Sequence, residues 1–319
     1  MKKVLLIGGG TGLSTISRVI KNYAVDLNLI VTVTDNGGSS GLLREGLNIP
    51  PPGDLRSNLI ALADNEDLLT KLFKYRFECD ELKNHSLGNL IIAGLKELTG
   101  SFPEAIYEAS NLLKIKGRVL PATEELINLV ARLKDGSLVW GEINISRVGG
   151  KIEEIFLDRK VNALTEAIDC IEVADIIIVG PGSVYTSIIP NFLIGDLKEV
   201  YKRSGAQKVF ICNLMTQPGE TDNFSLSQHV GLVEKYTEVP FDKIFYSCLD
   251  NVDDRIIERY KEQGAKVVEN DLKNDTRVEI LNGMSTVDIM DRVRKTVIRH
   301  SSKEIQKMMQ ILGVTGETV

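Results

Sequence analysis

Short apolar runs rich in β-branched residues recur along the chain, and most of them end in glycine-rich or polar loops. Continuous apolar runs of this length are typical of strands in a parallel sheet that is covered on both faces. They predict strands near residues 4, 29, 176, 209, 244 and 266, separated by segments with helical periodicity. This alternation predicts an α/β fold with a Rossmann-like, mainly parallel sheet.

Two stretches interrupt the alternation. Residues 55–115 carry apolar positions at helical spacing and predict a helical insertion beside the sheet. Residues 129–157 contain alternating strand-like segments around Asp135 and Gly136, a pair that favours a hairpin turn. They predict an antiparallel β patch, with its first hairpin extending to residue 145, added to the main sheet.

No linker-like stretch separates these parts, so we interpret 1–319 as a single α/β domain with a basic, partly helical C-terminal tail at 288–319. Apolar residues make up 43% and charged residues 26% of the chain, which is ordinary for a globular protein. The net charge of −6 disfavours wholesale binding to nucleic acid or to an anionic membrane.

The apolar runs and the cysteines indicate a location. No run approaches the ~20 residues that a membrane span needs, and the run at the N-terminus is too short for a secretory signal. The four cysteines lie far apart without a C-x-x-C pair, as expected for buried thiols in a reducing compartment. We therefore expect a cytoplasmic protein. Three histidines make a histidine-rich metal site unfavourable.

Two glycine-rich loops follow predicted strands, one near residue 8 and one near residue 180. Glycine lets backbone N–H groups come close to a ligand, and a helix that starts after the loop adds a favourable dipole for anions. A tight turn is the alternative for the first loop, and a capped strand-to-helix turn for the second. The candidate binding residues are Gly9, Gly10, Thr11 and Gly12, and Gly180, Gly182, Ser183 and Thr186.

A third loop of small and polar residues follows the strand near residue 29, and a proline-rich loop precedes Asp54. Asp35 and Asp54 are able to hold a hydrated Mg²⁺ against phosphates or to orient a hydroxyl. The alternatives are a turn residue for Asp35 and a helix cap for Asp54. The candidates in this group are Asp35, Asn36, Gly37, Gly38, Ser39 and Asp54.

Further polar residues lie where helices are expected to begin. Arg56 is within reach of a phosphate or lies on the surface, and His85 is an acid–base candidate or a helix cap. Asn89 suits a ligand oxygen or amide, and loop 216–221 is a substrate loop or a plain surface loop. No Ser/His/Asp set, zinc spacing or lysine-bearing P-loop is visible. The catalytic candidates are Asp35, Asp54 and His85.

Taken together, these motifs resemble the YvcK family, often called gluconeogenesis factors. That family shares a superfamily with 2-phospho-L-lactate transferase (CofD), an enzyme of coenzyme F420 biosynthesis. The similarity runs from residue 4 to about residue 300. The motifs that carry it are Gly8–Ser14, Thr34–Gly41, Pro51–Arg56, His85–Leu90, Gly180–Pro190 and Asn213–Thr221.

The resemblance implies a UDP-sugar ligand such as UDP-N-acetylglucosamine, or a related dinucleotide. It implies a role in cell shape and envelope synthesis during gluconeogenic growth, with envelope-synthesis or regulatory proteins as partners and a homodimer as an open possibility. It also implies a tyrosine and an arginine in the site, which match Tyr260 and Arg299. Where the family usually has two acids, this chain has Asp35 and Asn36, which weakens a two-carboxylate metal site.

Three functions stay open. The first, which we favour, is a nucleotide-sugar-binding regulatory protein, and the second is a Mg²⁺-dependent transferase acting on a nucleotide-linked phospho-substrate. The third is an NAD(P)-linked oxidoreductase, which is disfavoured because Leu13 stands where G-x-G-x-x-G has its third glycine. In each case we expect Asp35, Asp54 and Asn89 to line one pocket with the two glycine loops.

Overall fold

The computed structural model describes most of the 319 residues. The exceptions are 66, 79–81, 83, 84, 149–151, 250, 251, 253, 282–285, 291–294 and 315–319. Among the features expected from the sequence, Cys79, Asn84, the turn at 149–150 and the basic residues Arg292 and Arg294 therefore lie outside the described residues.

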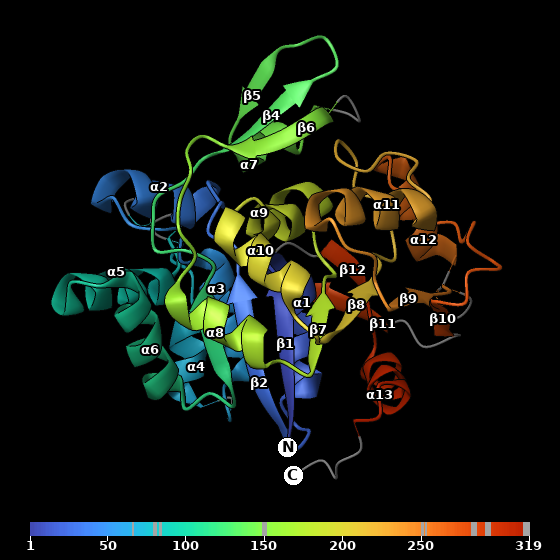
Figure 1. The fold of residues 1–319 in the computed structure, drawn as a ribbon. Coiled ribbons are helices and arrows are strands. Elements are labelled where there is room, and N and C mark those ends of the chain that lie inside the picture. Colours follow the sequence, from blue (N-terminus) through green and yellow to red (C-terminus); the bar gives the residue numbers. More distant parts are fainter. Residues whose placement is uncertain are drawn as a thin grey trace.

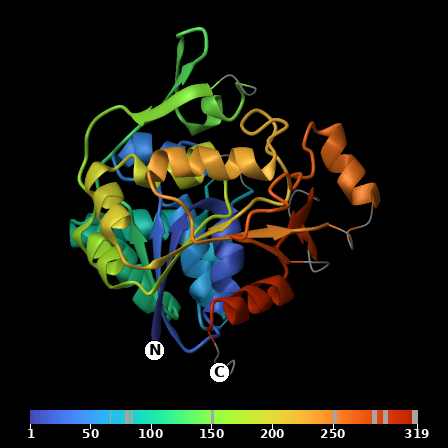
Figure 2. The same cartoon turned by 45° about the vertical axis from the view of Figure 1, so that its right-hand side comes forward.

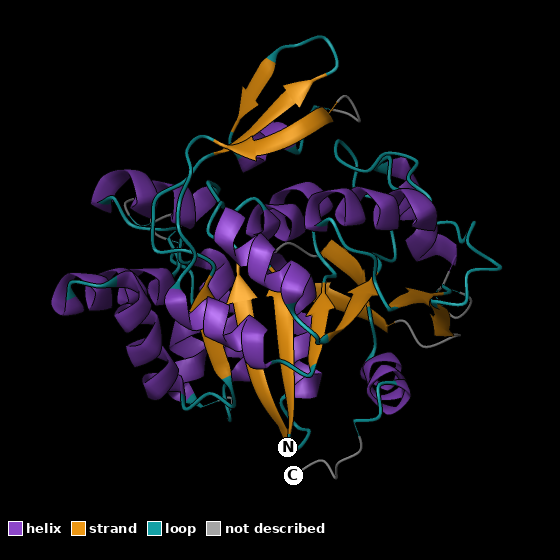
Figure 3. Cartoon of the chain, in the orientation of Figure 1, coloured by secondary structure: helices purple, strands orange, loops and turns teal. Residues whose placement is uncertain are grey.

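In the described part of the chain, seven parallel strands form the central sheet in the order β10-β9-β8-β7-β1-β2-β3 (Figures 1 and 3). The predicted α/β fold is confirmed. The strands are β1 Lys2–Gly8, β2 Val25–Val31, β3 Arg118–Pro121, β7 Ile176–Val179, β8 Gln207–Ile211, β9 Lys243–Ser247 and β10 Val278–Leu281.

The strand order reverses between β1 and β7. From β1 the chain proceeds outward through β2 to β3, and from β7 it proceeds in the other direction through β8 and β9 to β10. Ile7 of β1 is in register with Ile30 of β2 and with Val179 of β7. Loops that follow β1 and β7 therefore leave the same sheet edge in diverging directions, and such a switch point opens a crevice for ligands.

Helices cover both faces of the sheet (Figure 2). Leu5 and Ile7 of β1 pack on one layer, and Val4 and Leu6 pack on the other, as the alternation of side chains along a strand requires. The first layer contains α8 Thr165–Val173, α9 Ile189–Phe192, α10 Gly195–Arg203 and α11 Leu226–Thr237. The second contains α1 Gly10–Ile20, α3 Gly53–Leu62, α6 Phe102–Leu113 and α13 Ser302–Ile311.

The helical insertion comprises α3, α4 Leu68–Lys74, α5 Leu87–Thr99 and α6, as predicted. It is preceded by a helix that the sequence did not indicate, α2 Gly38–Leu47, where we expected an open loop. Gly37 takes the N-cap position, and Leu43 buries against Ile49 and Ala93. The glycines and serines of this segment favour a loop, but the burial of Leu43 against α5 stabilises a helix instead.

The antiparallel patch forms a separate three-stranded sheet in the order β5-β4-β6, which projects beyond the central sheet in Figure 1. Its strands are β4 Leu129–Leu133, β5 Leu138–Trp140 and β6 Ile152–Leu157. The second strand is shorter than predicted, because α7 Glu142–Ile145 replaces its C-terminal half. Gly141 has a φ of +82°, which ends the strand, and the Asn36 side chain accepts a hydrogen bond from the Ile143 N–H at 3.1 Å.

The predicted strand near residue 266 is wrong. Val267 forms an isolated antiparallel bridge with Met215, and the Thr216 N–H donates to the Lys266 carbonyl at 2.7 Å. The edge of the central sheet is instead β10, parallel to β9. Ala265 packs with Leu214 and Met215 of the loop after β8, and Val268 is buried in the core on one face of the central sheet. Burial without sheet pairing therefore produced the same apolar pattern as a strand.

The C-terminal region is a β-hairpin followed by a helix. Strands β11 Thr286–Met290 and β12 Lys295–Arg299 pair antiparallel, and α13 follows with a capping box between Ser301 and Glu304. The tail was expected to be partly helical, and its hairpin was not anticipated. Helix α12 Asp254–Glu262 lies before it in the chain.

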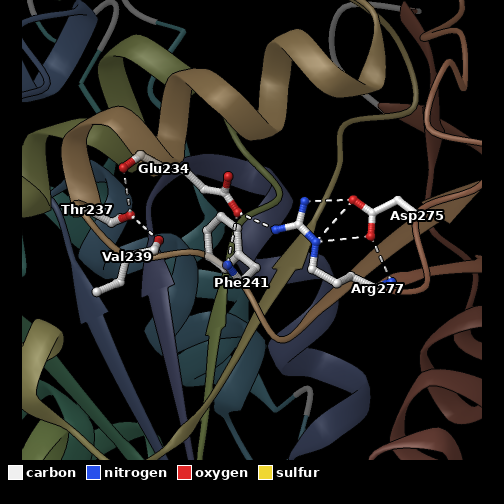
Figure 4. Close-up of polar contacts among 6 residues, drawn as sticks. All are labelled: Glu234, Thr237, Val239, Phe241, Asp275 and Arg277. Atoms are coloured by element: carbon white, nitrogen blue, oxygen red, sulfur yellow. Dashed lines mark hydrogen bonds and ion pairs between the residues drawn. The ribbon is translucent and has the colours of Figure 1, made fainter.

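An ion-pair network connects α11 to the segment that precedes β10 (Figure 4). Arg277 contacts Glu234 of α11 at 2.9 Å and Asp275 at 2.7 Å, and the same Glu234 accepts from the Phe241 N–H at 3.0 Å. Arg277 therefore ties the chain that enters β10 to α11. Within the described residues, none of the helices has the length and apolar character that crossing a membrane requires.

Candidate functional site

A cavity of about 540 Å³ lies at the carboxyl ends of β1, β7 and β8, which is within the usual range for small-molecule sites. It occupies the crevice at the switch point of the strand order. Its walls come from both glycine loops, the loop after β8, α12 and the end of β12. The lining includes Gly10–Gly12, Pro181–Ser183, Asn213–Pro218, Tyr260, Arg299 and His300.

The first glycine loop is held from two sides. Gly10 has a φ of +64°, and its N–H donates a hydrogen bond to the Asp54 carboxylate at 2.7 Å. A Cβ atom on Gly12 would lie 2.5 Å from the Pro181 carbonyl oxygen, so the two glycine loops touch through their backbones. The loop is more than a tight turn, because each glycine permits a contact with a segment distant in sequence.

The second glycine loop is held by side chains. Asn213 accepts from the Gly182 N–H at 3.0 Å and donates to the Gly182 carbonyl at 2.8 Å. Ser183 accepts from the Thr186 N–H and the Thr186 hydroxyl at 3.1 and 2.6 Å, and donates to the Glu220 carboxylate. Ser183 is therefore the cap of the helical turn that follows, and it is also part of the cavity wall.

The helical stretch after this loop is not a regular α-helix. A π-helical turn, η1 Val184–Ile188, precedes the short α9. Pro190 has no N–H to donate to the Thr186 carbonyl, which accepts from the Thr34 hydroxyl at 3.1 Å instead. With so short a helical segment, any ligand contact here depends on individual N–H and O–H groups rather than on a long helix dipole.

Three carboxyl groups gather beside the first glycine loop. Burial and the negative charge of Asp35 raise the pKa of Asp54 to about 7. The hydrogen bond from the Gly10 N–H and the positive charge of Arg56 act in the opposite direction and offset part of this increase. Burial raises the pKa of Glu142 to about 9, with further contributions from the charges of Asp35 and Asp54 and a hydrogen bond to Asp35. At neutral pH Glu142 keeps its proton, so it approaches Asp35 as a neutral donor.

Asp35 and Asp54 were also compatible with purely structural roles, as a turn residue and as a helix cap. Asp35 does act as a turn residue, since its carboxylate accepts from the Gly37 N–H at 2.7 Å, but it also faces Glu142. Asp54 is not the cap of α3, because Pro52 holds the N-cap position and Asp54 contacts Gly10. Within the described residues, no group of three or more His, Cys, Asp or Glu side chains is arranged to hold a metal ion.

A separate buried polar cluster contains the remaining early candidates. The Ser39 hydroxyl accepts from the Asn89 amide at 3.1 Å and from the Ser86 N–H at 3.2 Å, and the His85 ring lies 3.5 Å from it. Arg56 donates to the Ser86 hydroxyl, and burial lowers the pKa of Arg56 to about 10. The side chains of this cluster contact one another between α2, α3 and α5.

The expectation of one pocket holds in part. The two glycine loops do line one cavity, but Asp35, Asp54 and Asn89 are all absent from its lining; Asp54 contacts the first loop from behind, through the Gly10 N–H. Of the loop over 216–221, Thr216, Gln217 and Pro218 line the cavity. Asn36, Gly37, Gly38 and Ser39 belong to the start of α2 and its contacts with α5 and α7.

Tyr260 and Arg299 both line the cavity, as the family resemblance implied. The Tyr260 hydroxyl accepts from the Ile298 N–H at 2.9 Å, which joins α12 to β12. The Arg299 guanidinium donates to the Thr15 hydroxyl of α1 at 3.0 Å. These two hydrogen bonds connect α12 to β12 and β12 to α1 at the cavity wall.

The lining or supporting residues that were not predicted from the sequence include Glu142, Asn213, Glu220 and His300. Asn213 and Glu220 lie within the Asn213–Thr221 motif, whose polarity after an apolar strand was a usable signal. Glu142 lies in a stretch that was predicted to be a strand, and His300 lies within the tail at 288–319, where it was noted only as one of several basic residues. No local pattern marked either of them.

Comparison with known proteins agrees with this architecture. The model of the family described as 2-phospho-L-lactate transferase CofD matches residues 4–286. The Bacillus subtilis protein named gluconeogenesis factor is 41% identical over 96% of both chains, and a Thermotoga maritima relative is 48% identical over 97% of this chain and 98% of its own. The crystal structure of protein BH3568 from Bacillus halodurans has a TM-score of 0.89 at 40% identity, covering 97% of this chain and 99% of that one. The chain belongs to the CofD family and groups with its gluconeogenesis factors.

Proposed function

We propose that this protein binds a nucleotide-sugar of the UDP-N-acetylglucosamine class and thereby regulates cell-envelope synthesis and cell shape during gluconeogenic growth. The observation that carries the ligand is the cavity at the switch point, which residues of the two glycine loops line together with Arg299 and Tyr260. Backbone N–H groups and an arginine suit a diphosphate, and a tyrosine ring suits a uracil. The link to gluconeogenic growth rests on relatives named gluconeogenesis factor, such as the Bacillus subtilis protein, and the role in cell shape and envelope synthesis rests on the family resemblance alone.

Binding without turnover is the form of this proposal that the side chains favour. Glu142, the carboxyl group that lines the cavity, keeps its proton at neutral pH and is held by Asp35 and Thr186. Asn36 is engaged by α7 through its hydrogen bond with Ile143. These groups are therefore occupied in holding the loops together, which is the requirement of a binding site rather than of an acid–base pair.

Titration calorimetry with UDP-N-acetylglucosamine, UMP and NAD, each with and without Mg²⁺, tests the proposal. We expect the UDP-sugar to bind more tightly than UMP, because a monophosphate leaves some N–H donors to water alone. We expect chromatography to recover the UDP-sugar unchanged. Absence of heat with UDP-sugars would reject the proposal.

A second candidate is a Mg²⁺-dependent transferase acting on a nucleotide-linked phospho-substrate, as the family description suggests. The carboxyl group of Asp35 beside that of Asp54 favours it, since Mg²⁺ binds through one or two carboxylates and completes its shell with water. The ion would offset negative charge on the phospho-group. Product formation that requires Mg²⁺ and is lost in Asp54→Asn would support this candidate over the first.

A further inference from the structure

The loop after β8 and the end of α12 form one continuous part of the cavity wall. The Thr216 N–H donates to the Lys266 carbonyl at 2.7 Å, and the Lys266 N–H donates to the Thr216 hydroxyl at 2.8 Å. The Pro218 ring lies against Gly264, where a Cβ atom would be 3.7 Å from it. The cavity-lining residues of these two segments are uncharged and include the Tyr260 ring. Such a wall suits a nucleobase better than a phosphate.

Gln217 lines this part of the cavity on a backbone that is held in place. Its N–H donates to the Thr221 hydroxyl at 2.9 Å, and its carbonyl accepts from the N–H groups of Glu220 and Thr221 at 3.0 and 2.9 Å. The Glu220 carboxylate in turn accepts from the Ser183 hydroxyl of the second glycine loop. The Gln217 side chain therefore starts from a fixed position, and only its own torsions remain to be set.

The orientation of the Gln217 amide follows from that of Asn213. The Asn213 Oδ1 accepts from the Gly182 N–H at 3.0 Å, and its Nδ2 donates to the Gly182 carbonyl at 2.8 Å. A backbone N–H only donates and a carbonyl only accepts, so this pair determines which end of the Asn213 amide is the nitrogen. The same Nδ2 also donates to the Gln217 Oε1 at 3.5 Å. Gln217 therefore directs its amide oxygen towards Asn213, which leaves its Nε2 for other partners.

The Gln217 Nε2 carries two N–H donors and has no hydrogen-bond acceptor among the residues that the structure describes. The side chain is half-buried and lines the cavity, so an acceptor on a ligand would satisfy this nitrogen. Nucleobases differ at such a group, because uracil and guanine carry a carbonyl where cytosine and adenine carry an amino group. A carbonyl accepts from Nε2, whereas an amino group would set donor against donor.

We propose that Gln217, positioned by Asn213, selects the base of the bound nucleotide by donating to its carbonyl group, and so favours uracil or guanine over cytosine or adenine. The inference rests on the proposed function, in which the base lies against Tyr260. Discrimination comes mainly from the cost of the wrong base, since a donor that loses water without gaining an acceptor costs more than a good hydrogen bond contributes. The same selection disfavours NAD, whose base is adenine.

The test is titration calorimetry at neutral pH with UDP-glucose and CDP-glucose, two nucleotide-sugars that differ only in the base. We expect the wild type to bind UDP-glucose about tenfold more tightly, which is the value of about one hydrogen bond. Gln217→Glu keeps an oxygen for the Asn213 Nδ2 but presents a second oxygen to the base, so its preference should reverse towards CDP-glucose. Gln217→Leu should bind the two ligands equally. The ratio of affinities is the readout, because an added negative charge weakens both ligands.

Asn213→Asp tests the positioning role without changing the side chain that contacts the base. A carboxylate at position 213 accepts but cannot donate, so the Gln217 amide should turn its nitrogen towards it and present its oxygen to the cavity. We expect weaker binding of both ligands and a preference shifted towards CDP-glucose, whereas a purely structural role would weaken both equally. Gln310→Glu adds the same charge on the exposed side of α13, outside the cavity lining, and should retain the wild-type ratio. Circular dichroism and thermal melting verify that each variant is folded.

Failure of this inference is distinguishable from failure of the proposed function. Equal binding of UDP-glucose and CDP-glucose by the wild type, or an unchanged ratio in Gln217→Glu, would overturn the role of Gln217 and leave the ligand proposal intact. If no UDP-sugar binds, the ligand proposal fails, and the same titrations with UDP, GDP, CDP and ADP test base selection by themselves. A preference for CDP or ADP there, or no binding of any of the four, would overturn the inference as well.

Discussion

The backbone of Gly12 in the first glycine loop packs directly against Pro181 in the second, with room for no Cβ atom between them. A methyl group at Gly12 would lie 2.5 Å from the Pro181 carbonyl oxygen and 2.9 Å from its carbon, and neither atom belongs to a flexible side chain. We therefore predict that Gly12→Ala separates the two loops. The contact is between backbones, so no change of rotamer relieves it.

Gly12→Ala should abolish detectable binding of UDP-N-acetylglucosamine and lower the free energy of unfolding by about 1–3 kcal/mol, the usual cost of overpacking. The matched control is Gly231→Ala in α11, where a Cβ atom meets nothing within 4 Å. Because alanine favours a helix interior over glycine, this control should be neutral or more stable by about 1 kcal/mol. Calorimetry and urea unfolding measure both effects. Wild-type affinity in Gly12→Ala would contradict the paired-loop site.

Arg299 should contribute to ligand affinity rather than to stability. Its guanidinium donates to the hydroxyl of Thr15, which also lines the cavity, and a diphosphate offers a stronger, charged acceptor. Arg299→Ala should weaken binding by roughly 1.5–3 kcal/mol, the value of a hydrogen bond to a charged group. Calorimetry measures the loss, and Arg203→Ala on α10, which removes an exposed pair with Glu172, should change nothing. Equal affinity of both variants would exclude Arg299 from the site.

His229 should make the fold sensitive to acid. Burial lowers the pKa of its ring, and a hydrogen bond between Nδ1 and the Ser225 carbonyl at 2.9 Å offsets part of that effect. A pKa that is lower in the folded state means that stability is complete above the unfolded value of about 6.5 and is lost as pH falls below it. Urea unfolding at pH 8 and pH 5 measures the loss.

The control for this pH effect is His229→Asn, which keeps an N–H donor near the Ser225 carbonyl but cannot become charged. Its free energy of unfolding should fall less between pH 8 and pH 5 than that of the wild type, whatever its absolute stability. Identical slopes in the two proteins would assign acid sensitivity to other groups.

Arg277 should stabilise the β9–β10 side of the sheet. It pairs with Glu234 and Asp275, and about a third of its side chain is exposed, so solvent screens the pairs (Figure 4). We expect Arg277→Ala to lower the free energy of unfolding by about 1 kcal/mol. Lys261→Ala, which removes a more exposed pair with Glu258 within α12, should have an effect near zero. Equal effects of the two substitutions in urea unfolding would contradict a network role.

The sequence alone determined the parts of this protein that depend on local chain properties. Apolar runs placed β1, β2, β7, β8 and β9, because a strand buried on both faces must be apolar along its length. Glycines marked the loops after β1 and β7, and the parallel order implied that the loops would meet. Tyr260 and Arg299 came from family resemblance rather than from any local pattern.

Only the tertiary structure decided which segments pair and which side chains share a charge environment. The run at 265–268 is largely apolar because Ala265 packs with the loop after β8 and Val268 packs in the core on one face of the sheet, and no local pattern distinguishes such burial from that of an edge strand. Likewise, the proton that Glu142 retains and the orientation of the Gln217 amide depend on neighbours from distant elements. Pairing and protonation are long-range properties, since they follow from desolvation and charge after the chain has packed.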